Sequence, residues 1–355
     1  WVLRALNFLV VSCPCALVIS IPLSFFGGIG GASRQGILVK GGNYLEALAK
    51  ADTVVFDKTG TLTKGVFKVT KILPAEGITE ENVLTYAAKA EYFSTHPIAK
   101  SIMDAYGKPL AGVQITGYRE LSGRGICANA DGNTILAGSP QLLQDEKISF
   151  PLCELAGTKV YVALDGRYLG CIVIADEMKA DSKMAIANLK KMGVRQTVML
   201  TGDEEIIGKA VAEELGLDSC HANLLPQDKV AALERIHGSK HPGGKLVFVG
   251  DGINDAPVLA RADIGIAMGG LGSDAAIEAA DVVLMTDEPS KLVEAMQIAR
   301  ETRKIVIQNI LFALGVKALF LLLGAFGWVG MWLAVFGDVG VALLAVLNAM
   351  RILRK

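Results

Sequence analysis

Charged residues are almost absent from two long parts of this sequence. Residues 5–33 carry none, and residues 305–350 carry only Lys317 and Asp338. These parts therefore cannot form an ordinary soluble surface. Charged residues make up 20% of the whole chain of 355 residues, so the protein cannot lie entirely in lipid either. Because an apolar helix of about 20 residues spans a membrane, we expect one span in the first part and two in the second, with a turn at residues 327–330.

The sequence also lacks an excess of charge of one sign. Its middle region lacks cysteines at the spacing of a metal site. The net charge of −1 offers no basic field for nucleic acid, so we predict no nucleic-acid partner. Four of the six cysteines lie in the middle region without the spacing of a metal site. We expect them to be reduced core residues in a cytosolic compartment. They are Cys127, Cys153, Cys171 and Cys220.

Basic residues flank the expected spans, and the positive-inside rule places such flanks in the cytoplasm. They are Arg34, Lys40, Arg303, Lys304, Arg351, Arg354 and Lys355. We therefore predict an integral protein of the plasma (inner) membrane, in contact with membrane lipid, whose middle region and C-terminus are cytoplasmic. The sequence begins at Trp1 without an initiator methionine, so we expect a fragment of a longer protein.

Three apolar runs rich in β-branched residues each end in small, polar and acidic residues. The runs cover residues 53–56, 197–200 and 246–249. Continuous apolar runs of this length are typical of buried parallel strands. Because the carboxyl ends of parallel strands meet at one edge of a sheet, we expect the polar residues that follow the runs to converge there: Asp57, Thr201, Asp203 and Asp251.

A long interval separates the first of these strands from the other two. It has turn signals of its own, Asp131-Gly132 and Asp165-Gly166, which indicate a small inserted domain. The predicted division of the chain is a spanning helix with a stalk at 1–49, a catalytic domain in two parts at 50–65 and 172–300, the inserted domain at 66–171, and two spans with a basic tail at 301–355.

The run Asp57-Lys58-Thr59-Gly60-Thr61 is suited to phosphoryl transfer. An aspartate carboxylate attacks the γ-phosphate of ATP while Mg²⁺ offsets the phosphate charge, and we assign the Mg²⁺ to Asp57, Thr59 and Asp251. The other residues assigned to catalysis are Lys58, Thr201, Gly202, Asp203, Lys229, Asn254 and Asp255. Thr201-Gly202-Asp203 alone would more often be a simple turn, but the first run together with residues 250–257 favours catalysis.

These two runs resemble the signatures of P-type cation-pumping ATPases. The resemblance implies an α/β phosphorylation domain of the haloacid-dehalogenase-like fold, an inserted α+β nucleotide-binding domain and three transmembrane helices. In related phosphatases a second aspartate two residues after the nucleophile speeds hydrolysis, whereas Thr59 stands here and favours a lasting aspartyl-phosphate. A membrane-anchored phosphatase of the same fold is the alternative from another enzyme class.

The segment with Glu91, Ser94 and His96, followed by Gly123 and Gly125, resembles the ATP-binding pattern of the heavy-metal branch of that family. A histidine before proline is by itself more often a capped helix start, and a single Gly-x-Gly is weak evidence. The position of these residues in the inserted domain favours nucleotide binding. ATP and Mg²⁺ are therefore the expected cofactors.

The transported ion is indicated by the apolar segments. Proline opens a helix, so Cys13-Pro14-Cys15 can present two thiolates to a soft metal. An ionisable residue in lipid, such as Asp338, costs free energy and is expected to have a function or an ion-pair partner. Two thiolates and a carboxylate suit Zn²⁺ or Cd²⁺. The pattern resembles the zinc/cadmium/lead exporters, in which this Asp helps to bind the metal and this Lys, Lys317, is a counter-charge. A Cu⁺ exporter is the alternative.

The resemblance also implies parts that precede this sequence in the family, namely further membrane helices and a Thr-Gly-Glu loop that hydrolyses the phosphoenzyme. We therefore expect the N-terminal portion of the same pump as a partner. The chain as given is expected to bind ATP without completing transport. A fragment that only binds nucleotide and metal, without catalysis, is the non-enzymatic alternative.

Overall fold

The computed structural model describes residues 13–110, 113–121, 123–251, 255–269, 274–326, 328 and 330–354. The chain forms two compact units. The first unit comprises Trp1–Leu62, Ala180–Asp203 and Ala212–Lys355, and the second comprises Thr63–Lys179 and Glu204–Val211. The first unit therefore contains the membrane helices together with a large sheet, and the second is inserted into it after the first catalytic strand.

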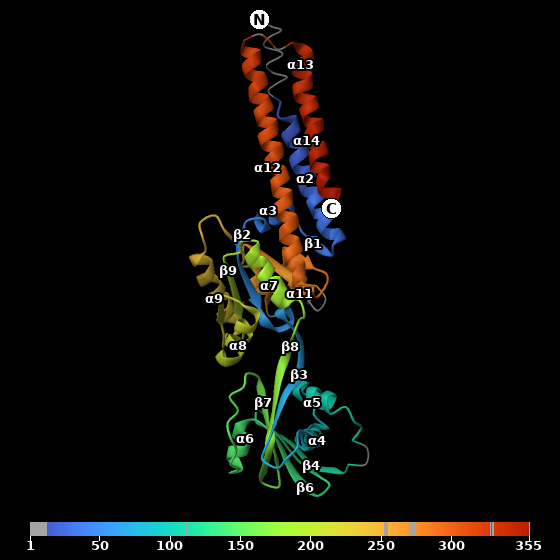
Figure 1. Ribbon diagram of the computed structural model, residues 1–355, viewed down its shortest axis with the longest axis vertical. Helices are drawn as coiled ribbons and strands as arrows, with labels where there is room; N and C mark the ends of the chain where they lie inside the picture. The colour runs from blue at the N-terminus through green and yellow to red at the C-terminus, as the bar shows by residue number, and fades with distance from the viewer. Residues whose placement is uncertain are drawn as a thin grey trace. The chain divides into compact units, whose positions relative to one another are not determined.

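A seven-stranded sheet forms the centre of the first unit, with the order β1-β13-β12-β11-β2-β9-β10 (Figure 1). All neighbouring strands are parallel except β1 and β13. The three apolar runs of the sequence are β2, β9 and β11, which lie side by side as buried parallel strands, as expected. The strands are β1 (Ile37–Val39), β2 (Ala51–Asp57), β9 (Gln196–Leu200), β10 (Ser219–His221), β11 (Lys245–Gly250), β12 (Ile264–Met268) and β13 (Val282–Leu284).

Helix α9 (Pro226–Ser239) covers one face of this sheet, where Leu233 packs in the same core as Phe248 of β11. Proline suits the first helical position, and the carboxylate of Asp228 accepts a hydrogen bond from the N–H of Leu225 at 3.2 Å. This capped start places Lys229 in the first turn. The other helices between these strands are α3 (Gly42–Leu48), α7 (Ser182–Lys191), α8 (Glu205–Leu215), α10 (Ala256–Leu259) and α11 (Asp274–Ala279).

The second unit contains a six-stranded antiparallel sheet with the order β3-β8-β7-β6-β5-β4. Asp131 and Gly132 join β5 to β6, and Asp165 and Gly166 join β7 to β8; these four residues have φ values of 53°, 84°, 46° and 78°. Two consecutive positive φ angles suit the tight turns that match strand twist, so the turn signals of the sequence formed hairpins. The strands are β3 (Thr63–Pro74), β4 (Ile115–Leu121), β5 (Gly125–Ala130), β6 (Asn133–Gly138), β7 (Thr158–Leu164) and β8 (Arg167–Met178).

Helices α4 (Glu80–Glu91) and α5 (Pro97–Tyr106) pack in one apolar core with this sheet, and α6 (Pro140–Asp145) packs in another. Helix α5 is capped by His96, whose Nδ1 accepts from the N–H of Ile98 at 3.2 Å. The unit is wider than the range 66–171 drawn from the sequence, because β3 and β8 pair along most of their length.

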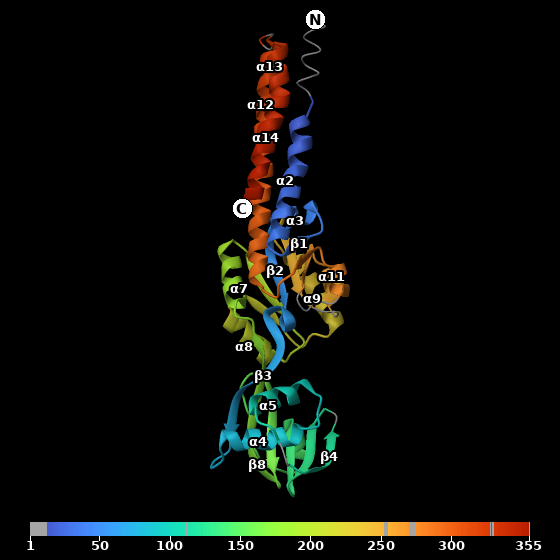
Figure 2. The same ribbon diagram turned by 90° about the vertical axis from the view of Figure 1, so that its right-hand side faces the viewer.

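Three helices are long and apolar enough to cross a membrane, namely Cys15–Arg34, Ser290–Ala325 and Phe336–Leu353. They pack against one another, as both views show (Figure 1 and Figure 2). The three expected spans are therefore confirmed, although residues 5–12 of the first lie outside the described residues. The corresponding elements are α2 (Cys15–Arg34), α12 (Ser290–Ala325), and the continuous series α13 (Met331–Val335), η3 (Phe336–Gly340), α14 (Val341–Ala349) and η4 (Met350–Arg354).

A buried polar contact joins two of these helices. The side-chain N–H of Asn309 in α12 donates to the carbonyl oxygen of Ala345 in α14 at 3.0 Å, and Asn348 donates to the Oδ1 of Asn309 at 2.8 Å. Buried polar groups in lipid need such partners, because water is not at hand to satisfy them. The contact therefore fixes the register between α12 and α14.

Candidate functional site

Asp57 lies at the carboxyl end of β2, in the middle of the large sheet, and its residue surface is only 5% exposed. The chain leaves the strand through a kinked segment in which Gly60 has a φ of 74°. A side chain rarely adopts this angle, and a Cβ on Gly60 would lie 1.6 Å from the Oδ2 of Asp251. Glycine is therefore required here so that Asp251, which follows β11, can approach the Asp57 segment.

Lys229 connects two buried carboxylates of this site. Its Nζ donates to the Oδ1 of Asp57 at 2.5 Å and to the Oδ1 of Asp255 at 2.9 Å. Burial and the neighbouring Asp255 carboxylate raise the pKa of Asp57 to about 7, although the Lys229 ammonium opposes this shift. Two like charges at this separation repel, so a further cation would favour the charged form of Asp57.

Asp57, Asp251 and Asp255 form a cluster whose carboxylate oxygens lie within 4.8 Å of one another. Three carboxylates are hard oxygen donors of the kind that Mg²⁺ prefers, so the residues present fit that ion. The side chain of Thr59, which the sequence placed among the Mg²⁺ ligands, is exposed, and that assignment stays a prediction. Asp255 lies in the carboxylate cluster beside the two assigned aspartates. Asn254 lies outside the described residues.

The residues after β9 occupy the neighbouring part of the same sheet edge. Thr201 is buried, and its Oγ1 accepts from the N–H of Asp203 at 3.1 Å, which shapes the turn around Gly202. The carboxylate of Asp203 forms an ion pair with Lys58, the residue that follows the nucleophile candidate. The structure therefore assigns Asp203 and Lys58 to each other, a pairing that the sequence did not indicate.

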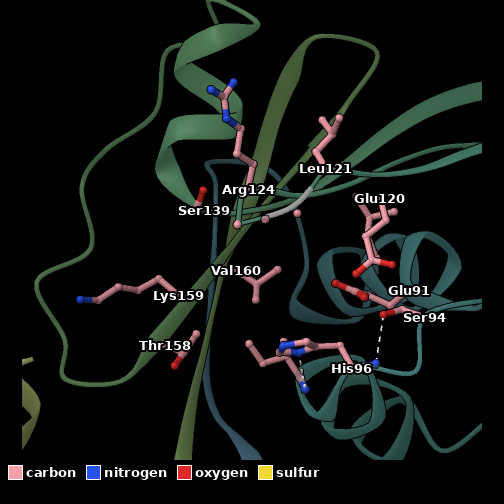
Figure 3. Close-up of a pocket in the computed structure, with 15 residues that line it drawn as sticks. Glu91, Ser94, His96, Glu120, Leu121, Arg124, Ser139, Thr158, Lys159 and Val160 are labelled. Atoms are coloured by element: carbon pink, nitrogen blue, oxygen red, sulfur yellow. Dashed lines mark hydrogen bonds between the residues drawn. The ribbon is translucent and has the colours of Figure 1, made fainter. Parts of the chain in front are cut away.

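A pocket of about 270 Å³ lies wholly within the inserted unit (Figure 3). All five residues that the sequence assigned to the nucleotide line it: Glu91, Ser94, His96, Gly123 and Gly125. In Figure 3 the acidic residues and His96 gather on the side of α4 and α5, and Lys159 extends from β7 on the opposite side. The sequence analysis missed the other charged residues of the lining, Glu120, Arg124 and Lys159, of which only Arg124 had a signal, its place between the two glycines.

The polar groups of this pocket suit an aromatic ring that carries both hydrogen-bond donors and hydrogen-bond acceptors. Burial raises the pKa of Glu91 to about 7, with a further contribution from Glu120, so its carboxyl group is partly protonated at neutral pH and can donate as well as accept. Because the Nδ1 of His96 accepts from the backbone, a neutral ring carries its proton on Nε2. The pocket thus offers donors and acceptors around a cavity large enough for an aromatic base.

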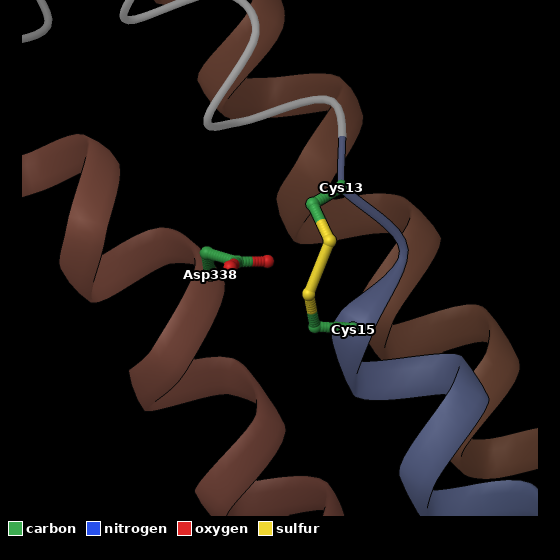
Figure 4. A group of neighbouring side chains, drawn as sticks. All are labelled: Cys13, Cys15 and Asp338. Carbon is green, nitrogen blue, oxygen red and sulfur yellow. A yellow bond between two sulfur atoms is a disulfide. The ribbon is translucent and has the colours of Figure 1, made fainter.

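The third candidate site lies between the membrane helices. Cys13, Cys15 and Asp338 bring their sulfur and oxygen atoms within 4.8 Å of one another, and the Asp338 carboxylate points at the sulfur atoms (Figure 4). The described helix starts at Cys15, because Pro14 has a non-helical ψ of 35°. Asp338 belongs to a short π-helical turn, η3, of a kind often found at functional sites.

Two features of this third site differ from the sequence expectation. Cys13 and Cys15 are joined by a disulfide, whereas two thiolates were expected, so the expected metal ligands would require the reduced form. Lys317 lines the same cavity of about 230 Å³ as Asp338 and donates to the carbonyl oxygen of Cys13, a partner that the sequence did not indicate, while its expected role as a counter-charge stays a prediction. The reason is local: Pro14 interrupts the helix and leaves that carbonyl open to an outside donor.

Comparison with known proteins gives consistent similarities. A family model of haloacid dehalogenase-like hydrolases matches residues 51–263. A cadmium, zinc and cobalt-transporting ATPase of Bacillus subtilis is 62% identical over 100% of this chain and 50% of its own length. A zinc-transporting ATPase of Synechocystis is 59% identical over 99% of this chain and 49% of its own. The chain thus spans about half the length of the curated relatives it matches.

Solved structures are similar along the same length. A zinc-transporting PIB-type ATPase in an E2.Pi state has a TM-score of 0.87 and 40% identity, and the match covers 99% of this chain and 58% of that one. The catalytic domain of the CPx-ATPase CopB-B, described for its conformational changes upon nucleotide binding, has a TM-score of 0.60 and 28% identity over 76% of this chain and 98% of its own. The fold of this chain, including its membrane helices, is therefore similar to that of a solved structure.

Proposed function

Because this chain belongs to the haloacid dehalogenase-like hydrolase family, and is similar throughout to metal-transporting ATPases, we propose that it is part of a P-type ATPase that exports Zn²⁺, Cd²⁺ or Pb²⁺. The observation that carries the proposal is the Asp57 site. A buried aspartate at a strand end, held by Lys229 and next to two more carboxylates, is arranged for attack on a phosphate and poorly arranged for a structural role.

In this reaction the Asp57 carboxylate attacks the γ-phosphorus of ATP, a new O–P bond forms, and ADP leaves. Lys229 holds the nucleophile in place and offsets the negative charge that gathers on the transferred group. Asp57, Thr59 and Asp251 would hold Mg²⁺, with the Asp255 carboxylate beside them, and the ion supplies further charge compensation when bound. Thr201 and Gly202 lie at the neighbouring strand end, where a hydroxyl and a backbone N–H suit phosphate oxygens.

Thr59 distinguishes the pump from the phosphatase alternative. Its position, two residues after Asp57, lacks the acid/base carboxylate that would speed hydrolysis of the aspartyl-phosphate. We expect the purified chain to take label from radiolabelled ATP into an acid-stable, hydroxylamine-labile form, and to release phosphate only slowly from model phosphoesters. Rapid turnover of model phosphoesters without a stable phosphoenzyme would favour the phosphatase, and absence of both would favour a fragment that only binds.

The nucleotide would bind in the pocket of the inserted unit, with its base near Glu91 and His96 and its phosphates toward Lys159. Gly123→Ala tests this assignment. Gly123 has a φ of 70° and no atom within 4 Å of an added Cβ, so the methyl group would meet the ligand and not the fold. We expect the dissociation constant of ATP, measured by titration calorimetry, to rise about tenfold.

Gly132→Ala is the matched control for backbone strain, because Gly132 has a φ of 84°, also has no atom within 4 Å of an added Cβ, and does not line the pocket. We expect it to lower thermal stability as much as Gly123→Ala while ATP binding stays at the wild-type value. Equal ATP affinity in all three proteins would contradict the assignment of the pocket.

The cargo would bind to reduced Cys13 and Cys15 together with Asp338. Two thiolates and a carboxylate suit Zn²⁺ and Cd²⁺, whereas Cu⁺ gains little from a carboxylate. In the full-length parent protein, under reducing conditions, we expect Zn²⁺ or Cd²⁺ to stimulate ATP hydrolysis and Asp338→Ala to abolish the stimulation. The control is Val339→Ala, which shortens an exposed side chain next to Asp338 that does not line the cavity. Equal or stronger stimulation by Cu⁺ would overturn the assignment of the ion.

The proposed setting follows from the same arrangement. The protein would lie in the plasma (inner) membrane with both catalytic units and the C-terminus in the cytoplasm, because basic residues flank the spans on that side. Its partners would be the transported ion, membrane lipid and the N-terminal portion of the same pump. That portion would hydrolyse the phosphoenzyme and complete the transport path.

A further inference from the structure

A cavity of about 470 Å³ lies beside α12, where the polar first part of the helix gives way to apolar sequence. It is lined by Ala49, Arg300, Arg303, Lys304, Ile307 and Gln308. The five residues from α12 recur at spacings of three and four, so they share one face of the helix. Three of the six lining residues are cations and none is a carboxylate, so the cavity itself is positively charged.

Among the residues that the structure describes, the cations of this cavity form no ion pair. A guanidinium nitrogen of Arg300 donates to the carbonyl oxygen of Met192, at the end of α7. In the part of the chain that the structure describes, Arg303 and Lys304 are exposed and have no carboxylate within ion-pair distance. Lys304 and Gln308 also line a neighbouring cavity of about 170 Å³, in which Glu301 and Arg351 lie.

An apolar ridge continues from the cavity along the same face of α12. Ile307 and Leu311 follow Lys304 at helical spacing and are 39% and 68% exposed. In a helix that spans a membrane, exposed side chains of this kind contact acyl chains. The helix therefore presents cations at the membrane boundary and an apolar surface immediately beyond them. A phospholipid has the matching arrangement, with a charged headgroup at the boundary and acyl chains beyond it.

We propose that this cavity binds the headgroup of an anionic phospholipid, with the phosphate between Arg303 and Lys304 and the acyl chains along Ile307 and Leu311. Basic residues next to the cytoplasmic end of a membrane helix attract anionic headgroups. Arginine can hold two phosphate oxygens at once, and the Gln308 amide adds a neutral donor for the glycerol or ester oxygens. Because Arg300 also binds the end of α7, the lipid would sit at the joint between the membrane helix and the catalytic sheet.

The test uses the whole chain, reconstituted in bilayers that contain equal amounts of phosphatidylglycerol and phosphatidylcholine, with retained lipids counted by native mass spectrometry after extraction. We expect the wild-type chain to retain phosphatidylglycerol preferentially. The double variant Arg303→Gln/Lys304→Gln should lose this preference, by roughly twenty-five-fold if each charge near the surface contributes about fivefold. The exchanged pair Arg303→Lys/Lys304→Arg, which keeps both charges, should retain it.

Arg34→Gln/Lys40→Gln is the matched control, because it removes two basic residues that flank a different span and do not line the cavity. It should leave the preference intact. An equal loss in this control would show a general surface potential and overturn the site, as would a wild-type chain without preference. Displacement of the lipid by inorganic phosphate, with no effect of Ile307→Ser/Leu311→Ser, would identify a free phosphate ion as the occupant and would also overturn the proposal.

Discussion

Asp57→Asn is expected to abolish the acid-stable label that radiolabelled ATP leaves on the chain. The substitution keeps the size and the hydrogen-bonding shape of the side chain but removes the negative oxygen that attacks phosphorus. Loss of a nucleophile costs several orders of magnitude, so the label should fall at least ~100-fold, below detection. Gel autoradiography after acid quenching, with and without hydroxylamine, measures this directly.

Asp165→Asn is the control for the loss of one carboxylate. Asp165 lies in a hairpin turn with a φ of 46°, which asparagine tolerates, and its Oδ1 accepts from the N–H of Thr134 at 2.8 Å, a bond that an amide oxygen can also accept. This variant should label like the wild type. Persistent label on Asp57→Asn would mean that another residue is the nucleophile and would refute the central assignment.

Gly60→Ala should also prevent phosphorylation, although it touches neither ATP nor the nucleophile. The added Cβ would lie 1.6 Å from the Oδ2 and 2.4 Å from the Cγ of Asp251, so one of the two segments must move. Displacement of Asp251 opens the carboxylate cluster with Asp57, and we expect phosphoenzyme formation to fall at least ~100-fold. Rapid-quench labelling measures the rate, and thermal unfolding shows whether the chain still folds.

Gly166→Ala separates this clash from backbone strain. Gly166 has a φ of 78°, close to the 74° of Gly60, but no atom lies within 4 Å of its added Cβ. It should lower the free energy of unfolding by about 1–2 kcal/mol, the cost of a left-handed conformation, and leave phosphorylation unchanged. If Gly60→Ala labels at the rate of Gly166→Ala, Asp251 does not take part in the reaction as proposed.

Local patterns were enough to place the strands, the hairpin turns and the spans. Apolar runs such as residues 246–249 cannot be exposed to water, and two-residue turns such as Asp131-Gly132 need residues that accept a positive φ. Long segments without charge can be satisfied only in lipid. These features depend on a few neighbouring residues and the solvent, so the sequence by itself determined them, together with the Asp57 run as the centre of the chemistry.

The composition of each site depended on pairings across long separations. Asp255 joins Asp57 through Lys229 because β11 pairs with β2 and α9 starts at the same sheet edge, a consequence of strand order and not of any local motif. The pairing of Lys58 with Asp203 likewise required β2 and β9 to be neighbours. Spacing in the sequence does not encode such distances.

The membrane helices illustrate the same division. The sequence by itself determined that Cys13, Cys15, Lys317 and Asp338 lie in apolar segments, where each polar group needs a partner. Only the tertiary structure decided the partners: the two sulfur atoms bond to each other, Asp338 faces them, and Lys317 donates to a carbonyl that Pro14 leaves open. The reason is that helix packing, with its register fixed by contacts such as Asn309 with Ala345, sets which side chains meet, and that register is a property of the whole bundle.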